Sequence, residues 1–217
     1  MKVNAIAKFL TGAALALLAA SAPALAHPHV FVSITSEIVF TPDGKVSGVR
    51  HHWKFDDMYS AFVTANLGTD GKDPTSEQLL PVAKTNAESL KEFDYFTYAK
   101  LSGKPQKFAD ATDYSMDYTP ADQTVTLHFT LPLEAPAHVK LMIVQVYDPT
   151  YFVAFELERK NPLSLVGAPS GCSISVSKPS LLSSAEQKRL ADVANTNDSP
   201  GADFGLKLSD RAIVACP

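Results

Sequence analysis

Two strand-like segments on either side of a tight-turn signal constrain the fold more than any other feature of this sequence. Residues 30–40 and 46–55 alternate apolar and polar side chains, and they flank Pro42-Asp43-Gly44. An Asp-Gly pair between such segments is typical of a β-hairpin. An Asp-Gly turn, or a four-residue loop of the same parity, predicts that the numbers of paired residues sum to 87.

Side-chain chemistry tests this register. One face would carry apolar pairs: Val32 with Phe55, Ile34 with Trp53, and Ile38 with Val49. The other face would carry Glu37 opposite Arg50 and Thr35 opposite His52. A slip of one residue would destroy both the apolar face and the charge pair. The sequence therefore predicts a hairpin with one face in the core, with Trp53 packed on Ile34.

Residues 57–93 have a helical pattern. Asp56 or Asp57 can cap a helix that extends to about residue 67, where Gly68 ends it. Thr75 and Gln78 resemble a capping box for a second helix that reaches about residue 93. Pro81 predicts a kink or a restart within that helix.

Most of the remaining chain alternates like β-strands. Strands are expected at residues 95–101, 104–109, 124–131, 139–147, 151–158, 172–177 and 208–216. A last helix is expected from Ser183 or Ser184 to about residue 195, followed by a loop at 196–206. The pattern predicts an α+β fold of mostly antiparallel, sandwich-like β-sheet, with a helical insertion and a C-terminal helix.

The N-terminal segment is typical of a secretory signal peptide. Lys2 and Lys8 precede an apolar stretch at residues 9–20, and Ala24-Leu25-Ala26 is a small-x-small cleavage signal. The apolar stretch is too short for a mature transmembrane helix. We therefore expect residues 1–26 to be removed and residues 27–217 to form a single periplasmic domain that does not span the membrane.

Cleavage after Ala26 would create a possible metal site. The mature chain would begin His27-Pro28-His29, so the α-amine and imidazole of His27 could chelate one ion, with His29 adding a third nitrogen. Pro28 lacks the amide proton that an amino-terminal square-planar chelate would need. The remaining donor set resembles a histidine brace, which suits Cu, Ni, Co or Zn. The alternative is that His-Pro-His is only a polar strand start.

Further candidate ligands are carboxylates. The hairpin register places His29 opposite Met58, with Asp56 diagonal to His29 on the same face. Asp148 lies in an Asp-Pro turn, where a local hydrogen-bonding role is equally typical. Glu156 is expected to point outward from its strand.

The other histidines have simpler interpretations. His51 is expected to be a hydrogen-bonded core residue, opposite Ser36. His52, His128 and His138 are expected in solvent, and His52 lies too far along its strand to join His29.

Composition limits the partners. The formal net charge is −4, which does not favour nucleic-acid binding. Cys172 and Cys216 are the only cysteines, and an oxidising compartment favours a disulfide between them over a thiolate metal pair. No nucleophile elbow, phosphate loop or His-Glu-x-x-His motif indicates an enzyme.

Several segments together resemble the DUF1007 family of exported bacterial proteins. They are residues 26–32, 53–56 with 59–60, 94–97, 127–129 with 131–133, and 147–156, with Gly171-Cys172 and the terminal Cys216-Pro217. Family members are often described as periplasmic components of an uncharacterised transport system, encoded beside nickel/cobalt transporter-like membrane proteins. Many carry an acidic, EF-hand-like loop between the inserted helices. Here that loop keeps only Asp70 and Asp73 before Glu77, too few carboxylates for calcium.

The resemblance and the residues together lead to one expectation. The chain would be a periplasmic accessory protein that binds a divalent transition metal through His27, His29, Asp56 and Asp148, and that exchanges it with a membrane metal transporter. Three alternatives stay open: an interaction subunit of a transporter that binds no metal, a histidine-brace copper redox enzyme, and a binding protein for a small organic solute.

Overall fold

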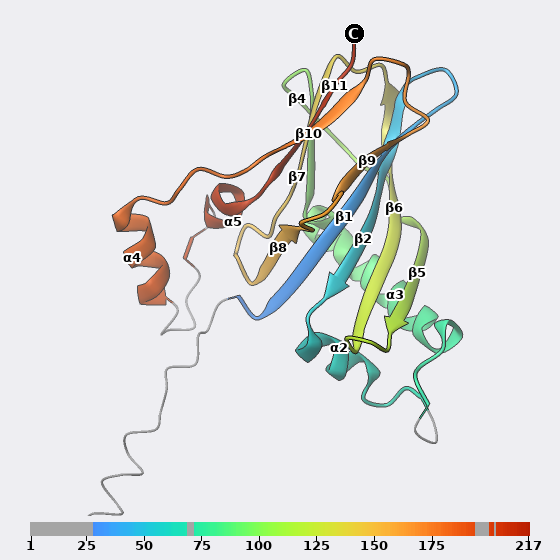
Figure 1. Cartoon of the computed structure of the whole chain (residues 1–217), viewed down its shortest axis with the longest axis vertical. Coiled ribbons are helices and arrows are strands. Elements are labelled where there is room, and N and C mark those ends of the chain that lie inside the picture. Colours follow the sequence, from blue (N-terminus) through green and yellow to red (C-terminus); the bar gives the residue numbers. More distant parts are fainter. Residues whose placement is uncertain (1–27, 69–71, 194–199, 202) are drawn as a thin grey trace, which may run out of the picture.

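The computed structural model describes residues 28–68, 72–193, 200–201 and 203–217, and Figure 1 shows their arrangement. The predicted signal peptide, His27 and Asp70 lie outside this part of the chain.

The first of two sheets, sheet A, is built around a long strand with two short partners on one edge. Its strand order is β5-β6-β2-β1, and both β8 and β9 pair in parallel with β1. The strands are β1 (Val30–Phe40), β2 (Val46–Phe55), β5 (Thr112–Thr119), β6 (Thr124–Ala137), β8 (Val153–Leu157) and β9 (Leu163–Val166). Strand β8 pairs with the first half of β1 and β9 with the second half.

The second sheet, sheet B, is wholly antiparallel, with order β10-β11-β7-β3-β4. Its strands are β3 (Thr97–Leu101), β4 (Lys104–Gln106), β7 (Leu141–Val146), β10 (Ser173–Ser177) and β11 (Arg211–Ala215). Apolar side chains such as Ile38 and Val49 of sheet A pack against Met142 and Val214 of sheet B. The predicted α+β, mostly antiparallel, sandwich-like fold is confirmed.

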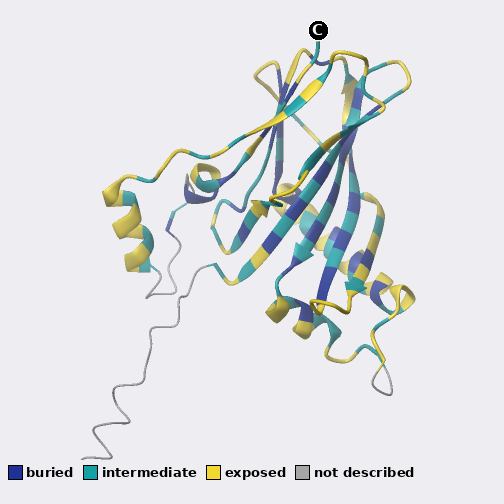
Figure 2. Ribbon diagram, in the orientation of Figure 1, coloured by how far each residue is buried: buried dark blue, intermediate teal, exposed yellow. Residues whose placement is uncertain are grey.

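Helices complete the core at the other end of sheet A: α2 (Asp57–Thr64), α3 (Ser76–Leu90) and the 3₁₀ helix η1 (Lys91–Phe96). Helices α4 (Ser184–Val193) and α5 (Asp203–Leu208) lie between β10 and β11 in the chain. Leu79 and Ala83 of α3 pack on Trp53 and Leu127, which makes α3 the cover for this end of the sheet. Figure 2 shows the buried side of α3 facing the strands, whereas α4 carries no buried residue.

The predicted capping box is confirmed, but Pro81 does not interrupt the helix. The Thr75 hydroxyl accepts the Gln78 N–H while the Gln78 side chain accepts the Thr75 N–H. Helix α3 continues through Pro81 because the proline lies in its second turn, where only the hydrogen bond to the Glu77 carbonyl is lost. Helix α5 occupies part of the segment expected to be a loop.

The hairpin register is confirmed from Val32↔Phe55 to Val39↔Gly48, but the turn is a three-residue loop rather than the predicted Asp-Gly turn or four-residue loop. Thr41 and Lys45 exchange hydrogen bonds around Pro42-Asp43-Gly44, and Gly44 has a φ of +80°. A bulge at Ser47 restores the register that this three-residue loop would have shifted by one. Trp53 is buried, 1 % exposed, and Arg50 pairs with Glu37, both as predicted.

The proposed pairing of His29 with Met58 is wrong. Strand β2 ends at Phe55, and Met58 already lies in α2, so no strand remains there to face His29.

Two strands of sheet A were not expected, β5 and β9. In β5 the alternation is broken by Asp113, whose φ is +51°, and by a bulge between Thr112 and Ser115. A local pattern search misses a strand with such an interruption.

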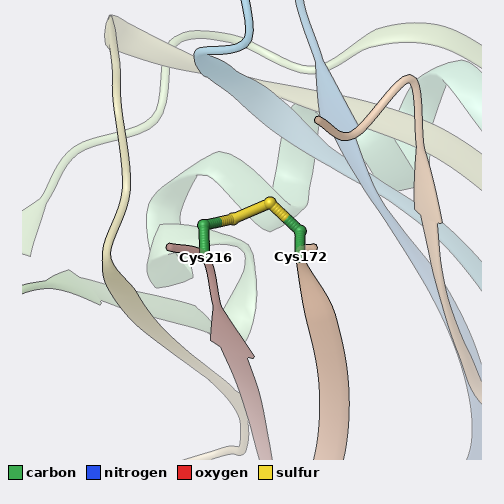
Figure 3. Close-up of a disulfide and its surroundings, with 2 residues drawn as sticks. All are labelled: Cys172 and Cys216. Carbon is green, nitrogen blue, oxygen red and sulfur yellow. A yellow bond between two sulfur atoms is a disulfide. The ribbon is translucent and has the colours of Figure 1, made fainter. Parts of the chain in front are cut away.

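Cys172 and Cys216 form the predicted disulfide, with an S–S distance of 2.05 Å (Figure 3). The bond ties the segment before β10 to the residue after β11. It lies at the end of the molecule that carries the C-terminus, far from the start of β1 (Figure 1).

Candidate functional site

His29 is exposed immediately before β1, beside the turn that precedes β8. Its backbone N–H donates to the carbonyl oxygen of Phe152 at 2.8 Å. Its imidazole packs on the Phe152 ring, with centroids 4.7 Å apart. The polar end of the His29 side chain is therefore held at the surface on an aromatic neighbour.

Asp148 organises the turn that holds Phe152. The carboxylate is buried, 4 % exposed, and accepts four hydrogen bonds. One oxygen accepts the N–H and the hydroxyl of Thr150, and the other accepts the N–H groups of Phe152 and Val153. A carboxylate offers about four lone-pair positions, so the turn uses all of them. The local role expected for an Asp-Pro turn is the one observed, and metal ligation by Asp148 stays a prediction.

Asp56 anchors β1 from the opposite side. One carboxylate oxygen accepts the Tyr59 N–H at 2.7 Å and caps α2. The other accepts the Phe31 N–H at 2.7 Å, and the Asp56 N–H returns a hydrogen bond to the Phe31 carbonyl. Asp56 therefore fixes the strand two residues beyond His29, and its contact with a metal also stays a prediction.

The three described candidate residues are thus connected through hydrogen bonds of the backbone at the start of β1. Asp56 accepts the Phe31 N–H. Asp148 accepts the Val153 N–H of the Phe152–Val153 peptide, whose carbonyl accepts from His29. Within residues 28–68, 72–193, 200–201 and 203–217, no group of three or more His, Cys, Asp or Glu side chains is arranged to hold a metal ion. His27, the remaining candidate, precedes the first described residue.

His51 is the hydrogen-bonded core histidine that the sequence predicts. Its Nδ1 lies 2.8 Å from the Ser36 hydroxyl, and its Nε2 lies 3.2 Å from the Thr97 hydroxyl. Since Thr97 donates its own proton to the Tyr95 carbonyl, its oxygen must accept from Nε2–H. Ser36 then donates to Nδ1. Burial, and secondarily the neighbouring His52, lower the pKa of His51 to about 3, so the ring is neutral and links the two sheets.

His52 and His128 lie on the outer face of sheet A as expected, but they are half-buried against each other rather than free in solvent. Their Nδ1 atoms are 2.6 Å apart, because β2 and β6 pair these residues directly. Burial, and then the proximity of His128, lower the pKa of His52. The sequence carries no short-range signal for this pair, since 76 residues separate its members. His138 is exposed, as predicted, and so is Glu156.

A cleft of about 580 Å³ lies on the outer face of sheet B. Tyr98 and Tyr147 stack at its side with ring centroids 4.3 Å apart, and burial followed by Tyr147 raises the pKa of Tyr98 to about 12. Asp94 and Tyr95 line the same cleft with positive φ angles of 50° and 52°, a conformation that costs energy in residues other than glycine. This cleft was not predicted from the sequence.

The described residues contain no helix long and apolar enough to cross a membrane. A family model described as "Protein of unknown function (DUF1007)" matches residues 12–216. A relative from Haemophilus influenzae, named only as an uncharacterized protein, is 22% identical over 200 residues, which cover 88% of this chain and 92% of the relative. The match extends over almost the whole sequence, and the chain belongs to the DUF1007 family.

Proposed function

We propose that the chain is a periplasmic accessory protein that binds a divalent transition metal at its processed N-terminus and exchanges it with a membrane metal transporter. Ni, Co, Cu and Zn all suit the amine and imidazole donors of His27 and His29. The disulfide is compatible with an oxidising compartment such as the periplasm.

One observation carries this proposal: the strand start that presents His29 is fixed from both sides. Asp56 holds Phe31. Asp148 accepts the Val153 N–H of the Phe152–Val153 peptide, and the carbonyl of that peptide accepts from His29. A ligand on a fixed backbone loses less conformational freedom when it binds an ion. Asp148 then acts by positioning His29, because its four hydrogen bonds occupy its lone-pair positions. Asp56 accepts two N–H groups, so it positions the strand and retains lone pairs for a metal.

Titration of the processed protein tests the proposal. The protein, with His52→Gln and His128→Gln so that the paired imidazoles of sheet A do not contribute, is purified after export, stripped with a chelator, and titrated calorimetrically with Ni(II), Co(II), Cu(II) and Zn(II). His29→Ala should weaken binding by at least about tenfold, through loss of one nitrogen ligand. The control His138→Gln changes an exposed imidazole on another element and should bind like the parent.

The same titration separates the alternatives. A chain that binds none of the four ions would be an interaction subunit rather than a metal carrier. Turnover of a reductant with oxygen or peroxide in the copper-loaded protein would instead indicate a histidine-brace redox enzyme.

A further inference from the structure

We propose that His52 and His128 form a second metal site on the outer face of sheet A, where their Nδ1 atoms bind one divalent transition-metal ion. None of its ligands belongs to the N-terminal site, so either proposal can fail without the other.

The strand register creates the site. Strands β2 and β6 are antiparallel, and their pairing continues on both sides of His52↔His128, through Arg50↔Thr130 and Lys54↔Thr126. Trp53 and Leu127, the adjacent pair, point into the core and are almost fully buried. The two imidazoles are therefore held on the opposite face by a backbone that the core packing fixes.

The facing nitrogens suit a cation. The rings are 4.8 Å apart between centroids and tilted by 64°, with the two Nδ1 atoms 2.6 Å apart. Two N–H groups cannot point at each other across this distance, so at most one proton lies between the nitrogens. A metal ion can replace that proton and accept a lone pair from each ring.

Asp117 lies next to His128, one of the two proposed ligands. The Nε2 atom of His128 lies 3.2 Å from a carboxylate oxygen of Asp117, yet it is buried and lacks a well-aligned hydrogen bond. Metal-ligating histidines commonly donate their second ring N–H to a carboxylate, which orients the ring and strengthens it as a ligand. Asp117, on the neighbouring strand β5, is positioned for this role, and a small rotation of His128 would align the bond.

Ligand spacing favours some ions over others. At a metal–nitrogen distance of about 2.0–2.1 Å, square-planar coordination needs about 2.9 Å between two adjacent nitrogens and tetrahedral coordination about 3.3 Å. The observed 2.6 Å is closer to the square-planar value. Cu(II) is also the strongest binder in the divalent series, so we expect it to bind most tightly, with Zn(II) weaker.

The local charges and the open coordination are compatible with an exchangeable ion. Arg50 is paired with Glu37, and Lys54 is paired with Asp122, so neither cation lacks a counter-charge. Since the described residues supply no third ligand, the remaining coordination positions are open to water or to a group from another molecule.

The test uses the full processed chain with His27→Ala and His29→Ala, which removes both N-terminal imidazoles. Cu(II) is titrated calorimetrically, and Zn(II) is followed through the imidazole nitrogen resonances. We expect one ion per chain, with the Nδ1 resonances of His52 and His128 shifting together. His52→Gln and His128→Gln should each lower the affinity by at least about 100-fold, more than loss of a supporting carboxylate. Asp117→Asn should lower it by about 10–100-fold.

Matched controls separate ligation from general surface effects. Asp192→Asn removes an exposed carboxylate on α4 and should leave Cu(II) affinity unchanged, as should His138→Gln. Trp53 fluorescence checks the fold of each variant. The Zn(II) spectra are recorded on the background chain, in which His52 and His128 are unchanged. The proposal would be overturned if Zn(II) left their Nδ1 resonances unshifted. It would also be overturned if Cu(II) bound as tightly to both glutamine variants as to the background chain.

Discussion

Asp56 and Phe31 are joined by a reciprocal pair of hydrogen bonds, in which the Phe31 N–H donates to the Asp56 carboxylate and the Asp56 N–H donates to the Phe31 carbonyl. The same carboxylate caps α2. One side chain therefore fixes both the start of β1 and the start of the helical insertion.

Asp56→Ala should lower the free energy of unfolding by about 2 kcal/mol, which combines the loss of a helix cap with the loss of a hydrogen bond to a charged group. Chelator-treated protein in a urea titration measures this cost without any contribution from metal. Asp57→Asn, one residue further along in the first turn, is the matched control. A loss as large in the control would indicate a general charge effect rather than the Asp56 contacts.

Asp148→Asn should destabilise the protein by about 2–4 kcal/mol. The amide offers one oxygen where the carboxylate offers two, so buried N–H groups of the turn lose their acceptors. Because the turn positions Phe152, the His29 imidazole resonances should shift as well. Asp192→Asn breaks a surface pair with Lys188 on α4 and should change stability little. Unchanged stability in Asp148→Asn would refute the structural role of this turn.

His51 should make the protein labile to acid. Its pKa in the folded state, about 3, lies below the ordinary value of 6.5, so the unfolded chain binds more protons between these two pH values. Stability should therefore fall as pH decreases from about 6.5 towards 3, by at most about 1.4 kcal/mol per pH unit from this group. His52, whose pKa is lowered too, acts in the same direction.

Urea titrations at several pH values, with a chelator present, measure this slope. His51→Gln cannot be protonated and should flatten the slope, although it also lowers the stability at pH 7. His138→Gln is the exposed control and should keep the parent slope. An unchanged slope in His51→Gln would show that other groups cause the acid lability.

Loss of the disulfide should cost about 4 kcal/mol, because Cys172 and Cys216 are 44 residues apart and the unfolded chain would lose that constraint. Unfolding of the protein with and without a reductant measures the difference. Mass analysis of the exported protein after alkylation should find no free thiol. Two alkylated cysteines would contradict the pairing.

The sequence predicts local features of this fold well, and long-range features less well. The hairpin register was recoverable because apolar and charged partners test it within a few residues, and the disulfide because two cysteines allow one pairing. The parallel pairing of β1 with β8 was not recoverable, since more than a hundred residues separate the strands. The contact between His52 and His128 was not recoverable either, because the two residues are far apart in the sequence. The sequence did predict the correct strand face for each of them.

For the candidate site, the sequence identified His29, Asp56 and Asp148 but not how they are connected. Residue type suggests a ligand, whereas only the fold shows that both carboxylates already accept backbone N–H groups. A carboxylate in a turn or at a helix start has the same sequence pattern whether it binds a metal or the backbone.

A metal site formed by the mature amine with His27 and His29 is tested most directly by acetylating the α-amine of His27. Cu(II) and Ni(II) are titrated into the processed chain and into the acetylated chain, both carrying His52→Gln and His128→Gln so that only the N-terminal site contributes. Acetylation converts the amine to an amide and removes the chelate ring that the amine forms with the imidazole of His27, and it adds no new amine. We predict a loss of affinity of at least about 100-fold, because one ligand and a chelate ring are removed together. Equal affinity in the two chains would contradict the account and place the metal elsewhere.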